Sequence, residues 1–313
     1  MKRALLFPGQ GSQAIGMGKE LCGAFQAAKD VFQEVDDALS QKLSLLMFDG
    51  SDADLKLTEN TQPALMAVSM AVIRVLEKQA GKKVSDLARC VAGHSLGEYA
   101  ALCAAGTFSL SDTARLLRRR GSAMQAAVPV GVGSMAALLG VDMQQAAEVA
   151  KEAAQGQVCA TANDNSVGQV VISGHKEAIE RAVAIAATKG FKRSVILPVS
   201  APFHCSLMQP AADVMQDALS NVKMNPPVVP VIANVTATEQ TDVNEIRKLL
   251  VAQVTGAVRW RESMLYLKEK SVEGAIEAGS GTVLAGLMKR IDKDIQVTSL
   301  HTPQDIEAFL KTI

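Results

Sequence analysis

A serine lies at the centre of Val91-Ala92-Gly93-His94-Ser95-Leu96-Gly97-Glu98-Tyr99, in a Gly-x-Ser-x-Gly pattern. An apolar run precedes the pattern and an alanine-rich run, residues 100–105, follows it, which predicts a strand, a sharp turn and a helix. Glycines on either side of the serine remove side chains that would collide in so tight a turn. A helix N-terminus behind the serine would favour negative charge. The context therefore favours a nucleophile over an ordinary turn with a surface serine.

The four histidines of the chain are the candidate bases for this nucleophile. His94 is next to the serine, where neighbouring side chains diverge, so we expect an orienting or packing role. His175 begins an expected helix and should be structural, and His301 lies in a polar segment and should be exposed. His204 follows an expected strand through a short turn, where the sites of open α/β sheets gather, and is the favoured base. No acidic residue stands out as a third member, so the orienting acceptor could be a backbone carbonyl.

The first expected strand ends in a glycine-rich loop, Phe7-Pro8-Gly9-Gln10-Gly11-Ser12-Gln13-Ala14. The loop formally satisfies the Gly-x-Gly-x-x-Ala fingerprint of dinucleotide-binding proteins. Pro8 before the first glycine, and the lack of an acidic residue at the end of a clear second strand, argue against a dinucleotide. A glycine-rich loop near the serine can instead direct a backbone N–H toward an oxyanion. We expect the N–H groups of Gln10 and Leu96 to form this pair.

Three consecutive arginines, Arg118 to Arg120, occur in an expected helix. The first two are interpreted as a solvated basic face. On a helical wheel at about 100° per residue, Arg120 falls between Leu116 and Leu117, on the apolar side. A buried guanidinium needs a compensating anion, because burying it alone is costly. That anion could be a protein carboxylate or a substrate carboxylate held bidentately, and the sequence does not separate the two.

Strands alternate with helices nearly throughout, which predicts a largely parallel α/β sheet. One helix is expected at residues 64–79, with Thr61 as its N-cap and Pro63 in its first turn. Between residues 129 and 199 the expected order is β-α-β-β-α-β, a ferredoxin-like arrangement that ends in a strand at 194–199. We therefore predict a catalytic core formed by residues 1–128 and 200–313, with residues 129–199 as an inserted subdomain. Other expected strands cover residues 4–7, 135–139, 158–162 and 170–173, and other expected helices cover 25–39, 111–124, 143–154 and 176–189.

Composition limits the function classes. The 313 residues include 32 basic and 32 acidic side chains, so no bulk charge favours nucleic acid or an anionic membrane. No apolar stretch is long enough to span a bilayer, and the N-terminal one is too short for a secretory signal. The five cysteines are scattered and form no Cys-x-x-Cys pair, so neither a disulfide framework nor a metal site is expected. These features predict a reduced, cytoplasmic location.

Taken together, the motifs resemble those of the malonyl-CoA:acyl carrier protein transacylases over essentially the whole chain. That family has an α/β-hydrolase-like core with a parallel sheet plus an inserted ferredoxin-like subdomain, in agreement with the expected strand order. The motifs that carry the resemblance are Phe7-Pro8-Gly9-Gln10-Gly11-Ser12-Gln13, Thr61-Gln62-Pro63-Ala64, Gly93-His94-Ser95-Leu96-Gly97-Glu98-Tyr99, Arg120-Gly121, Gly168-Gln169-Val170-Val171-Ile172-Ser173-Gly174-His175, Pro198-Val199-Ser200-Ala201-Pro202-Phe203-His204 and Glu277-Ala278-Gly279.

The resemblance implies a role for each matching position. Ser95 would be the acyl-enzyme nucleophile and His204 its base, while Arg120 would bind the malonyl carboxylate. A glutamine backbone carbonyl orients the histidine in this family, a role that falls on Gln253. The bulky Phe203 implies a preference for malonyl over methylmalonyl groups. Gln10 and Leu96 would supply the oxyanion N–H groups.

One departure from the family pattern lies close to the proposed histidine-orienting residue. Thr255-Gly256-Ala257 stands where the family often has Asn-Pro. This difference bears directly on the geometry that the resemblance implies for Gln253.

The implied function is malonyl transfer from malonyl-CoA to the phosphopantetheine thiol of acyl carrier protein, in fatty acid biosynthesis and without a cofactor. Three alternatives stay open: a serine thioesterase or hydrolase, an acyltransferase component of a malonate decarboxylase or polyketide system, and a dinucleotide-binding protein. Arg120 and the missing acid argue against the hydrolase.

Overall fold

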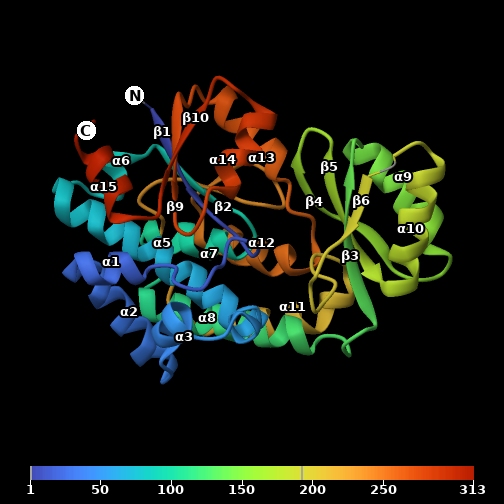
Figure 1. Ribbon diagram of the computed structural model, residues 1–313, viewed down its shortest axis with the longest axis horizontal. Helices are drawn as coiled ribbons and strands as arrows, with labels where there is room; N and C mark the ends of the chain where they lie inside the picture. The colour runs from blue at the N-terminus through green and yellow to red at the C-terminus, as the bar shows by residue number, and fades with distance from the viewer. Residues whose placement is uncertain (1, 192) are drawn as a thin grey trace.

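The computed structural model of the chain describes residues 2–191 and 193–313, which form a mixed α/β fold with two sheets side by side (Figure 1). The larger sheet has the strand order β10-β9-β1-β2-β7-β8, and every described pair is parallel except β7 with β8. Its strands are β1 (Arg3–Phe7), β2 (Cys90–Gly93), β7 (Val231–Ile232), β8 (Glu239–Gln240), β9 (Gly274–Ala278) and β10 (Gln296–Leu300).

Alternation along the central strands of the larger sheet divides two hydrophobic layers. Leu5 and Phe7 face a cluster that contains the long buried helix α5, whereas Ala4 and Leu6 face a cluster formed with α13 and α14. Both faces are covered, as expected for parallel strands made of continuous apolar runs. The helices around this sheet are α1 (Lys19–Ala24), α2 (Gln26–Leu39), α3 (Leu43–Asp49), α4 (Asp52–Leu55), α5 (Thr58–Ala80), α6 (Val84–Leu87), α7 (Leu96–Ala104), α8 (Leu110–Ala126), η1 (Ser206–Met208), α11 (Gln209–Ser220), α12 (Val243–Thr255), α13 (Trp260–Glu269), α14 (Val283–Ile291) and α15 (Pro303–Leu310).

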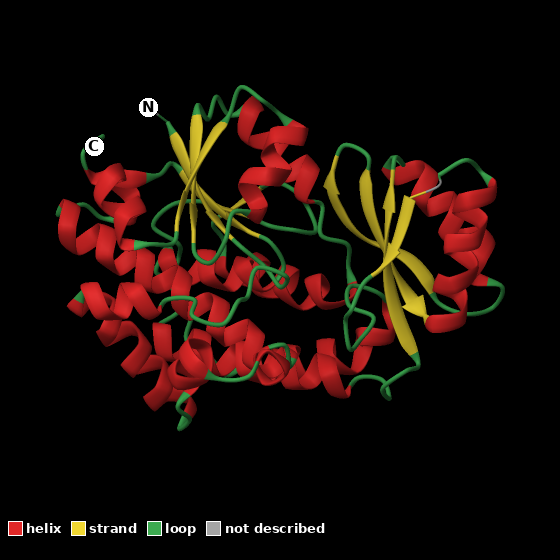
Figure 2. Cartoon of the chain, in the orientation of Figure 1, coloured by secondary structure: helices red, strands yellow, loops and turns green. Residues whose placement is uncertain are grey.

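The smaller sheet is antiparallel and has the order β4-β5-β3-β6, which confirms the ferredoxin-like arrangement (Figure 2). Helices α9 and α10 cover its outer face and share a separate hydrophobic cluster with it. The exact limits of the inserted subdomain, residues 129–199, stay a prediction. The elements of this unit are β3 (Gly133–Leu139), α9 (Met143–Ala154), β4 (Cys159–Ser166), β5 (Gln169–His175), α10 (Lys176–Thr188) and β6 (Arg193–Ile196).

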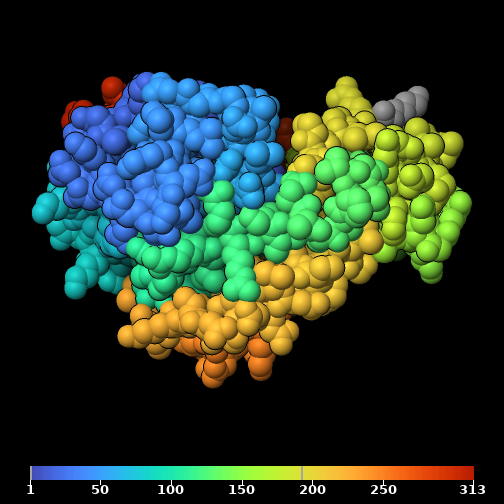
Figure 3. Space-filling model, turned by 90° about the horizontal axis from the view of Figure 1, so that it is seen from below, coloured from blue at the N-terminus to red at the C-terminus, as the bar shows by residue number. Residues whose placement is uncertain are grey.

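The two chain connections between the units lie against each other. A Cβ atom on Gly133 would come within 2.2 Å of the Pro202 side chain, so the outgoing and returning segments are in van der Waals contact. Seen from below, the regions of α8 (green) and α11 (gold) lie side by side and extend to the smaller unit (Figure 3). This contact requires glycine at position 133 and fixes where the chain returns to the core.

Two sequence expectations are wrong in ways that affect the site. Helix α5 begins at Thr58 rather than residue 64, so Thr61 is not its N-cap and Pro63 lies inside the helix. The first turn closes on the Leu57 carbonyl, and Gly121 of α8 lies so close that a Cβ there would be 2.6 Å from the Glu59 Cα. Tertiary packing thus extends the helix upstream of its proline.

The last strand of the smaller sheet is also shorter than expected. Strand β6 ends at Ile196, so residues 197–199 are not strand, and they turn instead to line a cavity. Pro198, which has no backbone N–H, cannot continue a sheet ladder at this point.

Candidate active site

Ser95 lies in the predicted turn between β2 and α7. Its φ of 53° and ψ of −110° are a strained backbone conformation for a residue other than glycine. A Cβ on Gly93 would be 1.9 Å from the Gly97 carbonyl, and one on Gly97 would be 2.3 Å from the Phe7 carbonyl oxygen. The two glycines of the motif therefore allow the close backbone contacts that hold the serine in this conformation.

His204 meets Ser95 across 109 positions of sequence, with 2.8 Å between the serine Oγ and the imidazole Nε2. The other ring nitrogen, Nδ1, lies 2.9 Å from the Gln253 carbonyl oxygen and 3.1 Å from that of Gly256. Carbonyl oxygens only accept, so Nδ1 carries the proton and Nε2 is left as the acceptor for the serine hydroxyl. The Gln253 carbonyl is available because it lies in the last turn of α12. The structure thus places Gln253 beside the histidine despite the altered residues 255–257.

The imidazole is buried and uncharged. Burial, followed by the positive charge of Arg120, lowers the pKa of His204 to about 3. The histidine is therefore neutral at pH 7, in the form that can accept a proton from a hydroxyl.

Arg120 is the second buried group beside the serine, with only 1% of its surface exposed. Its guanidinium donates from Nη1 to Gln62 Oε1 at 2.8 Å, and from Nη2 to Gln253 Oε1 at 2.8 Å and Ser95 Oγ at 3.1 Å. It also lies 5.6 Å from the centre of the Tyr99 ring, within cation–π distance. Within residues 2–191 and 193–313, no carboxylate forms an ion pair with it and its Nε has no hydrogen-bond partner. Because Arg120 also lines the cavity, its guanidinium is accessible to an external anion there.

A buried polar network that the sequence reasoning missed lies beneath these groups. The Gln253 amide donates to Glu98 Oε2 at 2.8 Å and to the Ser95 carbonyl at 3.0 Å. Asn234 accepts from the Ser95 N–H at 2.8 Å and donates to the Gly93 carbonyl at 2.7 Å, while its own N–H donates to Glu98. Burial raises the pKa of Glu98 to about 7. Glu98 is part of the nucleophile motif, whereas no local signal marked Asn234.

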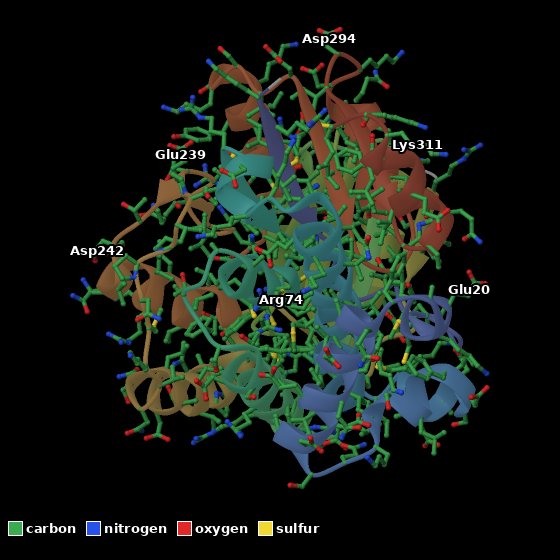
Figure 4. All side chains as sticks on the ribbon, turned by 90° about the vertical axis from the view of Figure 1, so that its left-hand side faces the viewer. Glu20, Arg74, Glu239, Asp242, Asp294 and Lys311 are labelled. Carbon is green, nitrogen blue, oxygen red and sulfur yellow. The ribbon has the colours of Figure 1, made fainter. Side chains whose placement is uncertain are left out.

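Charged side chains elsewhere are mostly on the outside, which makes this network unusual. Glu20, Asp294 and Lys311, labelled in Figure 4, are exposed at the edge of the molecule. Glu98 and Arg120, by contrast, are almost completely buried. Buried charged groups at a cleft are candidates for function because their burial is costly unless something offsets it.

The two residues expected to supply the oxyanion N–H groups border one cavity. Gln10 and Leu96 both line the cavity that contains Ser95. In the hydrogen bonds of the described part of the chain, neither backbone N–H donates to a protein acceptor. The loop can approach the serine turn because Gly9 has no side chain. A Cβ at this position would lie only 2.5 Å from the His94 carbonyl oxygen. This loop is thus placed against the serine turn, and Gln10 and Gly11 line the cavity there.

The cavity has a volume of about 620 Å³ and lies between the two units. The core contributes Ser95, Arg120 and His204, together with Phe203, whose side chain is 7% exposed. His94 also lines it and is 2.8 Å from the Asn165 Oδ1 of the smaller sheet. Other lining side chains from that unit include Met135, Asn163, Val171 and Leu197.

The remaining histidines lie away from the cavity. His175 accepts a hydrogen bond from the Val158 N–H, and His301 is partly exposed beside Asp305. Within the described residues there is no cluster of three or more metal-ligating side chains and no helix long and apolar enough to cross a membrane.

The chain is similar to known proteins over nearly its whole length. The family model described as "Acyl transferase domain" matches residues 4–300. The chain is 44% identical over 308 residues to the malonyl CoA-acyl carrier protein transacylase of Escherichia coli K12, covering 98% of both chains. It is 42% identical to that of Bacillus subtilis strain 168, covering 100% of this chain and 97% of the relative.

Solved structures of malonyltransferases are also similar to this chain over its whole length. An acyl-carrier-protein S-malonyltransferase from Bartonella henselae is 57% identical and superposes with a TM-score of 0.97, covering 100% of this chain and 99% of that one. The solved structure of a type II PKS acyl-carrier protein in complex with its malonyl-transacylase contains a chain that is 40% identical to this one. The two superpose with a TM-score of 0.96, covering 100% of both chains.

A serine in a strand–turn–helix, a histidine oriented by backbone carbonyls and a parallel sheet with an inserted antiparallel one define a serine-type acyltransferase fold. The chain belongs to the acyl transferase domain family, among the malonyl CoA-acyl carrier protein transacylases.

Proposed function

We propose that this chain transfers a malonyl group from malonyl-CoA to the phosphopantetheine thiol of acyl carrier protein, in cytoplasmic fatty acid biosynthesis. The observation that carries the proposal is the meeting of three groups at one hydroxyl. Ser95 Oγ lies 2.8 Å from a neutral imidazole and 3.1 Å from a buried guanidinium. The relatives' names, and the solved complex with an acyl-carrier protein, support the donor and acceptor.

In the first half-reaction, Ser95 Oγ attacks the thioester carbonyl while His204 Nε2 accepts its proton. The N–H groups of Gln10 and Leu96 stabilise the tetrahedral oxyanion, and Arg120 binds the free malonyl carboxylate. The carbon–sulfur bond then breaks, and His204 returns the proton to the coenzyme A sulfur. Malonyl-Ser95 remains.

The second half-reaction runs through the same groups in reverse. His204 deprotonates the phosphopantetheine thiol, whose sulfur attacks the malonyl ester. Collapse of the second intermediate releases Ser95, which takes its proton back from His204. The Gln253 carbonyl holds the imidazole in place throughout, so a third acidic residue is not needed.

Intact-mass spectrometry after mixing with malonyl-CoA tests this proposal. We expect one malonyl adduct on Ser95, which disappears when acyl carrier protein is added and appears as malonyl carrier protein. Ser95→Ala should give no adduct and reduce transfer by about 10³-fold or more, because such residues act as a unit. An adduct that persists in Ser95→Ala would remove this serine from the mechanism. Release of free malonate instead of transfer would favour the thioesterase.

A further inference from the structure

The contact between Arg120 and Ser95 gives the buried arginine a second role. In the structure, the Ser95 hydroxyl donates to His204 Nε2 and accepts from Arg120 Nη2 at 3.1 Å. A lone pair of the serine oxygen therefore points at a cation, although attack on a carbonyl carbon requires a lone pair. A hydrogen bond from a charged donor is among the stronger ones, so this contact lowers the nucleophilicity of the serine.

The hydrogens of the guanidinium decide what a carboxylate must displace. A guanidinium offers two bidentate forks, Nε with Nη2 and Nη1 with Nη2, and both include Nη2. The two hydrogens of Nη2 are donated to Gln253 Oε1 and Ser95 Oγ. Gln253 is fully buried, and its amide is held by Glu98 and the Ser95 carbonyl, whereas the Ser95 hydroxyl lines the cavity. A carboxylate that binds bidentately therefore replaces Ser95 Oγ.

We propose that Arg120 restrains the Ser95 hydroxyl in the free protein and that a carboxylate bound at Arg120 releases it for attack. The proposal rests on the proposed function and adds a specificity mechanism to it. An acyl group that carries its own carboxylate frees the nucleophile, and a neutral acyl group leaves the restraint in place. Discrimination then lies in the rate of serine acylation and not only in binding.

The same event strengthens the base. The positive charge of Arg120 is one of the causes that lower the pKa of His204, second to burial. A bound carboxylate neutralises this charge, so the imidazole accepts the serine proton more readily. Binding of a carboxylate at Arg120 thus both frees the lone pair of Ser95 and makes His204 a stronger base.

A neutral probe in the wild-type protein separates release from binding. Methanesulfonyl fluoride modifies a serine by forming a sulfur–oxygen bond and expelling fluoride, with the serine proton passing to His204. Formate can fill the position of the malonyl carboxylate beside this probe, and its occupancy is measured by competition with malonyl-CoA. We expect formate to accelerate sulfonylation of Ser95 about tenfold, relative to chloride at equal ionic strength. Formate that competes with malonyl-CoA but does not accelerate sulfonylation would overturn the proposal.

Arg120→Met provides an independent measurement that needs no added anion. Without the restraint, Ser95 should react with methanesulfonyl fluoride about tenfold faster than in the wild type, and formate should not change this rate. The midpoint of the pH dependence of the labelling rate should shift upward, because the charge that lowers the pKa of His204 is gone. Arg119→Met, at an exposed neighbour that pairs with Asp217, is the matched control and should behave as the wild type. If formate does not compete with malonyl-CoA, the labelling rate of Arg120→Met relative to the wild type and to Arg119→Met is the test of the restraint. Unchanged or slower labelling in a folded Arg120→Met would overturn the restraint, while malonylation of wild-type Ser95 would leave the proposed function intact.

Discussion

The two sides of the cavity differ in how their side chains are held. The core side, which we call the floor, consists of Ser95, Arg120 and His204, which line the cavity, and of Gln253 beneath them. Each of the four takes part in several hydrogen bonds. The side formed by the smaller sheet, which we call the wall, consists of Met135, Asn163, Asn165, Val171 and Leu197. Asn165 of the wall lies 2.8 Å from the ring of His94, the chain neighbour of Ser95. We infer that the floor carries the chemistry and that the wall shapes the space for the acyl group.

Replacing Arg120 in the floor should lower kcat/KM for malonyl-CoA more than any replacement in the wall. In Arg120→Ala, kcat/KM for malonyl-CoA should fall about 10³-fold, since a buried bidentate charge contact is lost. The ratio of acetyl-CoA to malonyl-CoA activity should rise in the same variant. Arg120→Lys should restore little, because an ammonium cannot form a two-pronged contact.

Steady-state kinetics with both thioesters, on protein shown to be folded by circular dichroism, checks this prediction. Arg119→Ala is the control and should retain wild-type values. A parallel fall of malonyl and acetyl activities would assign Arg120 a purely structural role in the floor.

Glu98 tests whether the buried network supports the floor. Glu98→Gln removes the charged acceptor of the Gln253 amide, and we expect kcat to fall about tenfold with little change in KM. Stability should also change with pH. The folded-state pKa of Glu98 is raised from 4.5 to about 7, so its carboxyl favours the folded state below pH 4.5 and this contribution is lost as the pH rises to about 7.

Chemical denaturation of wild type and Glu98→Gln at several pH values measures this loss. The variant should gain about 3 kcal/mol relative to the wild type between pH 4.5 and pH 7. Glu277→Gln is a useful comparison, because Glu277 is also buried but accepts from the backbone N–H groups of Leu284 and Ala285 and does not line the cavity. It should leave kcat unchanged. A pH-independent stability difference for Glu98→Gln would mean that folding does not raise the pKa of Glu98.

The network also shows where prediction from sequence stops. The serine turn was predictable because the steric need for Gly93 and Gly97 is local, and α9 matches its expected bounds because its periodicity and cap are local. Asn234, by contrast, lies 139 positions from Ser95 and is brought there only by the pairing of β7 with β2. The early start of α5 has the same origin, since its contact with Gly121 depends on another helix. Residue types at fixed spacing predict local geometry, whereas the partners of buried polar groups depend on tertiary packing.

Phe203 should control selectivity at the boundary of floor and wall. Its ring lines the cavity next to His204 and is nearly buried, so we expect it to crowd an α-methyl group on the acyl chain. The wild type should prefer malonyl-CoA to methylmalonyl-CoA. In Phe203→Ser the ratio of the two kcat/KM values should fall about tenfold, which is within the effect that one methyl group has in an apolar pocket. Phe203→Leu keeps most of the bulk and should retain the preference. Competition assays with both thioesters check this, and equal use of the two by the wild type would contradict it.

Asp164 offers the smallest expected effect and the most direct test of the wall. Its backbone N–H donates to the Val258 carbonyl, and its buried carboxylate forms an ion pair with Arg261 at 2.9 Å, so it fastens β4 to α13. Asn163 and Asn165, on either side of it, line the cavity. Asp164→Asn should therefore raise KM for malonyl-CoA about threefold and lower stability by about 2 kcal/mol, while kcat stays near the wild-type value. Asp217→Asn, at an exposed ion pair with Arg119, is the control and should change neither quantity by much. If kcat fell as far as KM rose, the wall would take part in the chemistry and the division between the two sides of the cavity would not hold.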